Sequence, residues 1–193
     1  MNALILNGGT AEAPFPEIVR RAADRLEGEG ASVVSFELTT MDIKPCRGCF
    51  SCWIKTPGVC YQRDAMDVII PILAKADIAV WVTPIAFGGY GYHLKKALDR
   101  SIPVLLPFFM MIGGEVHHPM RYGKEPRLAA IGVLPEPDPE SEDIFHKLVA
   151  RNAINMHASP VSFVLYAKED NGRWQDKLEG LVPPPSGRKE EGR

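Results

Sequence analysis

The chain has 193 residues, of which 46% are hydrophobic and 24% charged, and its formal net charge is −2. This size allows one domain with a sizeable core, and the near-neutral charge disfavours nucleic acid or an anionic membrane as a partner. The opening residues, MNALILNGG, lack the features of a signal peptide, and no apolar run approaches the ~18 residues that span a bilayer. We therefore expect a cytoplasmic protein that binds neither nucleic acid nor a membrane.

The predicted elements alternate between short apolar strands and helices. Residues 3–7 (ALILN) form an apolar run typical of a strand buried on both faces, and residues 16–30 show helical spacing that stops at glycines. A second strand is expected over residues 32–38, and the cysteine-containing segment follows it. A helix then begins after Asp64, a candidate N-cap. A third strand over residues 77–84 leads through the turn FGGYGY into the helix HLKKALDR.

The second half of the chain continues the same alternation. A fourth strand is predicted over residues 127–134 and a fifth over residues 160–166, with a long helix that starts in the acidic stretch PDPESED between them. Strands that alternate with helices predict right-handed crossovers around a parallel sheet. We expect an α/β fold with a five-stranded parallel sheet of order 2-1-3-4-5 and helices on both faces. Residues 167–193 are predicted to form a polar extension, flexible or in contact with a neighbouring subunit.

A sheet of this order has a predictable ligand site. Ligands bind at the carboxyl ends of the strands where the strand order reverses, here between the first and third strands. The loops that follow those strands cover residues 8–16 and 83–92, and the cysteine segment follows the second strand. We therefore expect all three segments to meet on one rim of the sheet.

The first of these loops, NGGTAEAPFPE, precedes a helix N-terminus, where free backbone N–H groups attract anions. Gly8, Gly9 and Thr10 are thus candidate phosphate ligands. Glu12 and the prolines of the loop remove positive charge and N–H donors, so a plain strand-to-helix turn is the alternative.

The loop after the third strand, TPIAFGGYGY, combines glycines with aromatic rings. Gly88 and Gly89 would let a flat ligand approach the backbone, and Phe87 and Tyr90 could cover its ring. The alternative is a simple glycine turn in which the aromatic side chains pack against the protein.

Four cysteines lie in the pattern Cys46-x2-Cys49-x2-Cys52-x7-Cys60. In a cytoplasmic protein such clustered thiols suggest metal or redox chemistry rather than structural disulfides. The pattern leaves three alternatives open: an iron–sulfur cluster, a tetrahedral zinc site, and thiols that are unliganded or redox-active.

The stretch CRGCFSCWIKTPGVCYQRDAMDVIIPILAKADIAVWVTPIAFGGYGYHLKKALDR resembles the flavodoxin-like, NADPH-dependent FMN reductase family, which includes the iron–sulfur flavoproteins. The similarity covers roughly residues 1–135. Its most specific parts are the spaced cysteines followed by Asp64, the Thr83-Pro84 pair, and Lys95 with Asp99-Arg100. Two departures are the phosphate loop, which lacks the arginine of the usual Gly-Ser-Pro-Arg, and Ala86, where many members have an aromatic residue.

The resemblance implies a flavodoxin-like FMN-binding domain over residues 1–166 that passes electrons from NAD(P)H to a small-molecule or protein acceptor. It also implies a homodimer or homotetramer, and no side chain that must act as acid or base. The four cysteines match the ligands of a 4Fe-4S cluster. A non-enzymatic electron carrier, or a cysteine-based metal or redox sensor without FMN, is the competing class. The implied cofactor-binding residues are Gly8, Gly9, Thr10, Thr83, Pro84, Ile85, Phe87, Gly88, Gly89, Tyr90 and Arg121.

Overall fold

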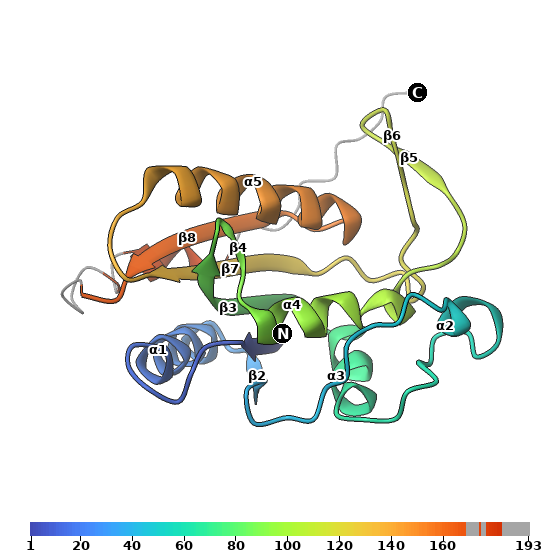
Figure 1. Ribbon diagram of the computed structural model, residues 1–193, viewed down its shortest axis with the longest axis horizontal. Helices are drawn as coiled ribbons and strands as arrows, with labels where there is room; N and C mark the ends of the chain where they lie inside the picture. Colours follow the sequence, from blue (N-terminus) through green and yellow to red (C-terminus); the bar gives the residue numbers. More distant parts are fainter. Residues whose placement is uncertain (169–173, 175–176, 183–193) are drawn as a thin grey trace.

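The computed structural model describes residues 1–168, 174 and 177–182. Within these residues the main sheet has five parallel strands in the order β2-β1-β3-β7-β8, which confirms the predicted order (Figure 1). The strands in the middle of this order are buried on both faces, as their continuous apolar runs require. Their bounds are β1 Asn2–Asn7, β2 Ser32–Glu37, β3 Ile78–Ala86, β7 Arg127–Leu134 and β8 Pro160–Tyr166.

Helices cover both faces of this sheet, as expected. Helix α1 (Phe15–Gly28) buries an apolar stripe against one face, while α3 (Met66–Leu73), α4 (Tyr92–Asp99) and α5 (Pro139–Asn155) pack on the other. The two core clusters therefore lie on opposite sides of the sheet, and Figure 1 shows α1 and α5 on these two sides. No helix in the described part of the chain is long and apolar enough to cross a membrane.

Local signals explain where these helices begin. The N-cap of α5 is Asp138, whose carboxylate accepts a hydrogen bond from the N–H of Ser141 at 3.2 Å. Asp64 precedes α3 by two residues, because the N-cap there is Ala65, and its Oδ1 accepts a hydrogen bond from the N–H of Met66 at 3.0 Å. Asp64 thus accepts a hydrogen bond from the first turn of the helix, as a cap would, but it lies one residue before the N-cap position.

Several short elements lie outside the sequence-based prediction. Strand β4 (Gly89–Tyr90) pairs antiparallel with the end of β3, where we expected only a glycine-rich turn. Strands β5 (Met110–Ile112) and β6 (Glu115–His117) form a hairpin in the connector before β7, and Figure 1 shows this hairpin projecting from the body of the molecule. The remaining short helices are α2 (Ser51–Ile54), η1 (Ile102–Val104) and η2 (Glu179–Leu181).

Part of the predicted C-terminal extension packs against the sheet. Trp174, Leu178 and Leu181 are buried in the cluster that α1 covers. Residues 169–173, 175–176 and 183–193 lie outside the described residues, so the prediction that the extension is flexible or contacts a neighbouring subunit stays untested there. The boundary at residue 166 also remains a prediction.

Candidate functional site

The loop after β1 packs closely against its neighbours. A side chain at Gly8 would place its Cβ 2.8 Å from the backbone N of Leu94 in α4, and one at Gly9 would lie 2.0 Å from Cδ1 of Phe15. The N–H of Gly8 also donates to the carbonyl of Val82 at 2.8 Å. Only glycine fits at these two positions, and the loop is held next to the N-terminal end of α4.

The turn after β3 is held by Thr83. Its buried hydroxyl accepts a hydrogen bond from the N–H of Gly91 at 2.9 Å and donates to the carbonyl of Pro84 at 3.0 Å. Thr83 therefore shapes the turn from inside. Ile85 is 9% exposed and packs against Gly132 of β7, which anchors the same turn to the sheet.

Phe87 stands at the tip of this turn with its side chain fully in solvent. Its exposed fraction is 102%, and its φ of 51° is a left-handed conformation that costs energy for a bulky residue. Gly88 follows with φ 73°, and a Cβ there would lie 2.5 Å from Cγ2 of Ile144 in α5. Strained backbone of this kind gathers at functional sites. The turn thus offers an exposed aromatic ring at the carboxyl edge of the sheet.

Tyr90 faces away from this exposed ring. It packs edge-to-face against Trp81 and Phe145, with ring centroids 5.7 and 5.9 Å away. Its hydroxyl accepts a hydrogen bond from Asn152 at 3.0 Å, and burial raises the pKa of Tyr90 to about 12. The structure therefore does not bring Tyr90 together with Phe87 as two covers of one flat ligand.

Several donors of the first loop are already used within the protein. The N–H of Gly9 donates to Oδ1 of Asn7 at 2.9 Å, and the N–H of Glu12 donates to Oγ1 of Thr10 at 3.3 Å. Pro14 and Pro16 carry no N–H at all. The first loop alone is consequently a poor cradle for a phosphate, in line with its missing arginine.

His93 has a buried ring nitrogen that the sequence did not assign to the site. It lies in the first turn of α4, next to the Leu94 that touches the Gly8 loop, and its Nδ1 is buried without a hydrogen-bond partner among the described residues. The N–H groups of a helix N-terminus favour an anion. The N-terminus of α4 therefore lies beside the first loop and adds N–H groups next to it. The position of His93 directly after the glycine turn was the available signal.

The cysteine segment does not lie on this rim of the same chain, so the expectation that three loops meet there is wrong. Trp53 of α2 donates its Nε1–H to the carbonyls of Ile102 and Leu105 at 3.3 and 3.1 Å, which places α2 against η1. Figure 1 shows α2 at the end of α4 away from β4. The reason is tertiary packing: after β2 the chain buries Leu38 and Ile43 in the core and so leaves the carboxyl edge.

A buried ion pair fixes the ends of the cysteine segment. Arg100 and Asp64 have side chains that are 1% and 0% exposed, and their closest N–O distance is 2.6 Å. Burial alone would raise the pKa of Asp64, but hydrogen bonds from Arg100 and from the N–H groups of Lys44 and Met66 hold it below the usual range. The charged form of Asp64 is therefore the stable one in the fold.

All four cysteines line one small cavity of about 30 Å³, which Ile102 closes on one side. The thiols form no disulfide, and Cys46 and Cys49 are exposed while Cys52 is buried. A hydrogen bond with Ser51 and the nearby Arg47 lower the pKa of Cys49, whereas burial and then the neighbouring cysteines raise that of Cys52.

This donor set suits an iron–sulfur cluster or zinc in chemistry and in its convergence on one cavity. As the loop is folded here, no group of three or more His, Cys, Asp or Glu side chains in the described part of the chain is arranged to hold a metal ion. Binding a cluster would therefore require the four thiols to move relative to one another within the segment.

Arg121 lies beside the cysteine segment. Its Nε donates to the carbonyl of Pro103 at 2.9 Å and its Nη2 to that of Leu105 at 3.2 Å, while its Cδ lies 3.3 Å from where a Cβ on Gly58 would be. The structure thus does not place Arg121 with the glycine loops of its own chain. The predicted contact between Arg121 and a flavin stays a prediction.

A groove of about 620 Å³ lies between α4 and α5 and extends to the cysteine segment. Trp81 and Tyr90 line it near the β3–β4 turn, and Cys46, Phe50 and His118 line it near the cysteine segment. Its wall is largely apolar, as is usual for pockets that bind organic ligands.

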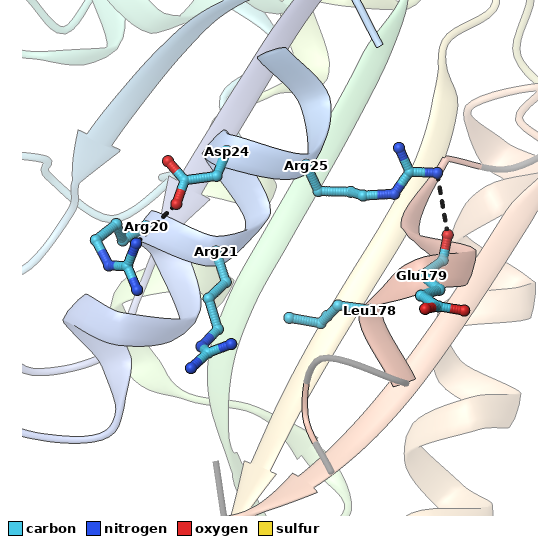
Figure 2. A pocket seen from close by; sticks show the side chains of 6 residues that line it. All are labelled: Arg20, Arg21, Asp24, Arg25, Leu178 and Glu179. Carbon is cyan, nitrogen blue, oxygen red and sulfur yellow. Dashed lines mark hydrogen bonds and ion pairs between the residues drawn. The ribbon is translucent and has the colours of Figure 1, made fainter. Parts of the chain in front are cut away.

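A wider hollow of about 830 Å³ lies over α1 on the opposite face of the sheet (Figure 2). Its arginines are already engaged: Arg20 pairs with Glu17 and Asp24, and Arg25 donates to the carbonyl of Glu179 at 3.4 Å. Figure 2 shows these side chains spread along α1 rather than converging on a point. The hollow therefore does not compete with the rim or the cysteine segment as a site.

Comparison with known proteins points to one group of flavoproteins. The model of a family described as NADPH-dependent FMN reductase matches residues 1–119. An iron–sulfur flavoprotein of Methanocaldococcus jannaschii is 32% identical over 115 residues, which are 56% of this chain and 58% of that protein. One from Archaeoglobus fulgidus is 29% identical over 82 residues, 42% of this chain and 36% of that protein. The chain thus matches less than two thirds of the length of these relatives.

Solved structures share the fold at low sequence identity. An NAD(P)H:quinone oxidoreductase from Methanothermobacter marburgensis has a TM-score of 0.67 at 11% identity, with 93% of each chain covered. An azoreductase from Bacillus anthracis has a TM-score of 0.61 at 14% identity, covering 94% of this chain and 92% of that one. At these identities the comparison supports the flavodoxin-like fold and nothing finer.

Proposed function

Because the chain belongs to the NADPH-dependent FMN reductase family, we propose that it is an FMN-dependent NAD(P)H oxidoreductase that acts in the cytoplasm. The observation that carries this proposal is Phe87, a fully exposed aromatic side chain held in strained backbone at the carboxyl edge of the sheet. Gly88 and Gly89 follow it, so the two positions after the ring carry no side chain that could hinder a flat ligand. In the alternative interpretation the β3–β4 turn has no ligand and its aromatic side chains pack against the protein. That arrangement would not leave the ring of Phe87 in solvent.

The residues at the rim divide into two groups by chemistry. The turn with Phe87, Gly88 and Gly89 suits the isoalloxazine ring, and the Gly8 loop with the N-terminus of α4 and His93 suits the phosphate. When bound, FMN would supply the hydride and single-electron chemistry, so the protein needs only to bind and orient.

We further propose that the four cysteines hold a 4Fe-4S cluster, which would exchange single electrons with the flavin. Support comes from the shared cavity of the thiols and from the archaeal relatives, which are named iron–sulfur flavoproteins. Zinc at the same thiolates, or thiols without a metal, are the alternatives that the metal analysis below separates.

The proposed assembly is a homodimer or homotetramer that passes electrons to a small-molecule or protein acceptor. The β5–β6 hairpin projects from the body and exposes apolar side chains, which favours burial against another subunit. The exposed side chains of the hairpin region are Phe108, Phe109, Met110, Met111 and Val116.

Replacing Phe87 by alanine is expected to weaken FMN binding several-fold to about tenfold, since a lost aromatic contact is worth about 0.5–1.5 kcal/mol. The measurement is fluorescence titration of the flavin-free protein with FMN. The variant Phe87→Tyr keeps the ring and should bind as tightly as the wild type. Equal affinity for all three proteins would show that Phe87 does not contact the flavin.

Replacing Cys52 or Cys60 by serine is expected to remove bound iron and sulfide, about four of each per chain, while the flavin is retained. The measurement is an absorbance spectrum with iron, zinc and sulfide analysis after anaerobic purification. Flavin without iron in the wild type would rule out the cluster. Iron without flavin would rule out the reductase and favour a metal or redox sensor. The small number of free N–H donors in the first loop favours this second function.

A further inference from the structure

Arg100 contacts both ends of the cysteine segment at once. Its Nη1 donates to the carbonyl of Lys44 and to Oδ2 of Asp64, each at 2.6 Å. Its Nη2 donates to Oδ1 of Asp64 at 3.0 Å and to the carbonyl of Gln62 at 3.3 Å. Lys44 precedes Cys46 by two residues, and Gln62 follows Cys60 by two. The guanidinium therefore closes the loop that carries every cysteine of the chain.

One donor of Arg100 is left over. Its Nε is buried and has no hydrogen-bond partner among the described residues. Because the whole residue is only 1% exposed, bulk water does not serve as that partner. The guanidinium lies beside Cys60: burial alone would lower the pKa of Arg100, but hydrogen bonds and charge from Asp64 and Cys60 raise it. A buried N–H without a partner is costly, so its retention next to a thiol needs an explanation.

We propose that Arg100 is a positioning residue of the cysteine site, which clamps both ends of the loop and offers its Nε–H to the sulfur of a metal-bound Cys60. This rests on the proposed metal-binding role of the cysteines. Four thiolates around a divalent ion carry a net charge of about −2, which is stable in a partly buried site only when the sulfurs accept hydrogen bonds. Asp64 in turn orients the guanidinium.

Lysine cannot replace Arg100 in this role. The planar guanidinium reaches Asp64 and two carbonyls with fixed geometry, and a lysine ammonium keeps the charge but not the fork. Arg100→Lys also removes the Nε–H. The substitution therefore separates the hydrogen-bonding role from the positive charge.

The test is a titration of the reduced, metal-free full-length protein with Cd²⁺, followed by the thiolate-to-metal absorption. Arg100→Lys is expected to bind Cd²⁺ about 10–100-fold more weakly than the wild type, as for other residues that support metal ligands. The matched control is Arg63→Lys. Arg63 is exposed, and within the described residues its guanidinium pairs with Asp67 alone. It should bind like the wild type.

A second readout compares two variants at saturating Cd²⁺ to separate a hydrogen bond to sulfur from loop closure. The cadmium NMR resonance should shift further from the wild-type position in Arg100→Lys, which loses the Nε–H, than in Asp64→Asn, which keeps it. If Arg100→Lys fails to fold, Asp64→Asn, which keeps the Nε–H but loosens the fork, should still weaken Cd²⁺ binding.

Wild-type affinity and an unshifted resonance in Arg100→Lys would overturn the proposal, as would a wild-type protein that binds no Cd²⁺. Failure of the cluster proposal looks different. The purified protein would then lack iron and sulfide, while the difference in Cd²⁺ affinity between wild type and Arg100→Lys would remain.

Discussion

Replacing Asp64 by alanine is expected to lower the free energy of unfolding by about 3–5 kcal/mol, because it leaves a buried guanidinium without its counter-charge. Both side chains of the pair are essentially without solvent contact, and Arg100 cannot lose its proton to escape the cost. The Arg100 guanidinium, which binds the carbonyls of Lys44 and Gln62 at the two ends of the loop, would also lose the partner that orients it. Chemical denaturation followed by circular dichroism measures the effect.

The matched control for this prediction is Asp67→Ala, which breaks the pair between Asp67, 28% exposed, and the exposed Arg63. Such a pair is worth about 0.3–0.5 kcal/mol, so the control should be nearly neutral. A loss of less than about 1 kcal/mol in Asp64→Ala would contradict the account of the pair as a buried anchor.

The contribution of Asp64 should depend on pH in one direction. Its pKa is lowered in the fold, so the charged carboxylate stabilises the native state at every pH above the unfolded pKa of about 3.9. That stability is lost as the pH falls through the folded value. The difference between wild type and Asp64→Ala should thus stay constant from neutral pH down to about 4 and shrink below it. A difference that grows on acidification would contradict the sign of the shift.

Replacing Gly9 by alanine is expected to cost about 1–3 kcal/mol of stability and to weaken FMN binding. The new Cβ would lie 2.0 Å from the ring of Phe15, which is 7% exposed and packed with Ile5 and Ile18 between the sheet and α1. Either the ring or the loop must move, and the loop is the part proposed to face the phosphate. Denaturation and FMN titration measure the two effects.

Gly28→Ala is the matched control, because a Cβ on Gly28 would meet nothing within 4 Å. At this helical position alanine should be neutral or stabilising by up to about 1 kcal/mol. If Gly9→Ala loses stability but binds FMN like the wild type, the first loop does not hold the phosphate. If it loses neither, the close packing against Phe15 is not a constraint in solution.

The sheet and its order followed from local features of the sequence. Apolar runs such as residues 3–7 and 127–134 can be stable only when covered on both faces, and the helices between them require crossovers. The glycine turn after β3 was likewise visible, because Gly88 adopts a backbone conformation that other residues resist. These features are local, or depend only on which elements must be buried.

The site could be predicted only in part, since side-chain direction depends on distant neighbours. Tyr90 and Phe87 looked equivalent in the sequence, yet Trp81 and Phe145 draw Tyr90 into the core while Phe87 stays in solvent. The approach of α4 to the Gly8 loop likewise depends on tertiary packing, since a Cβ on Gly8 would lie 2.8 Å from the backbone N of Leu94.

The cysteine segment shows where the information in the sequence ends. The spacing of the cysteines was enough to indicate their chemistry, because ligand type and loop length are local properties. Their place in the molecule was not local: burial of Leu38 and Ile43 and the clamp of Arg100 carry the segment from the carboxyl edge to the far end of α4. Contacts between residues far apart in the chain decide that path, so only the folded structure contains it.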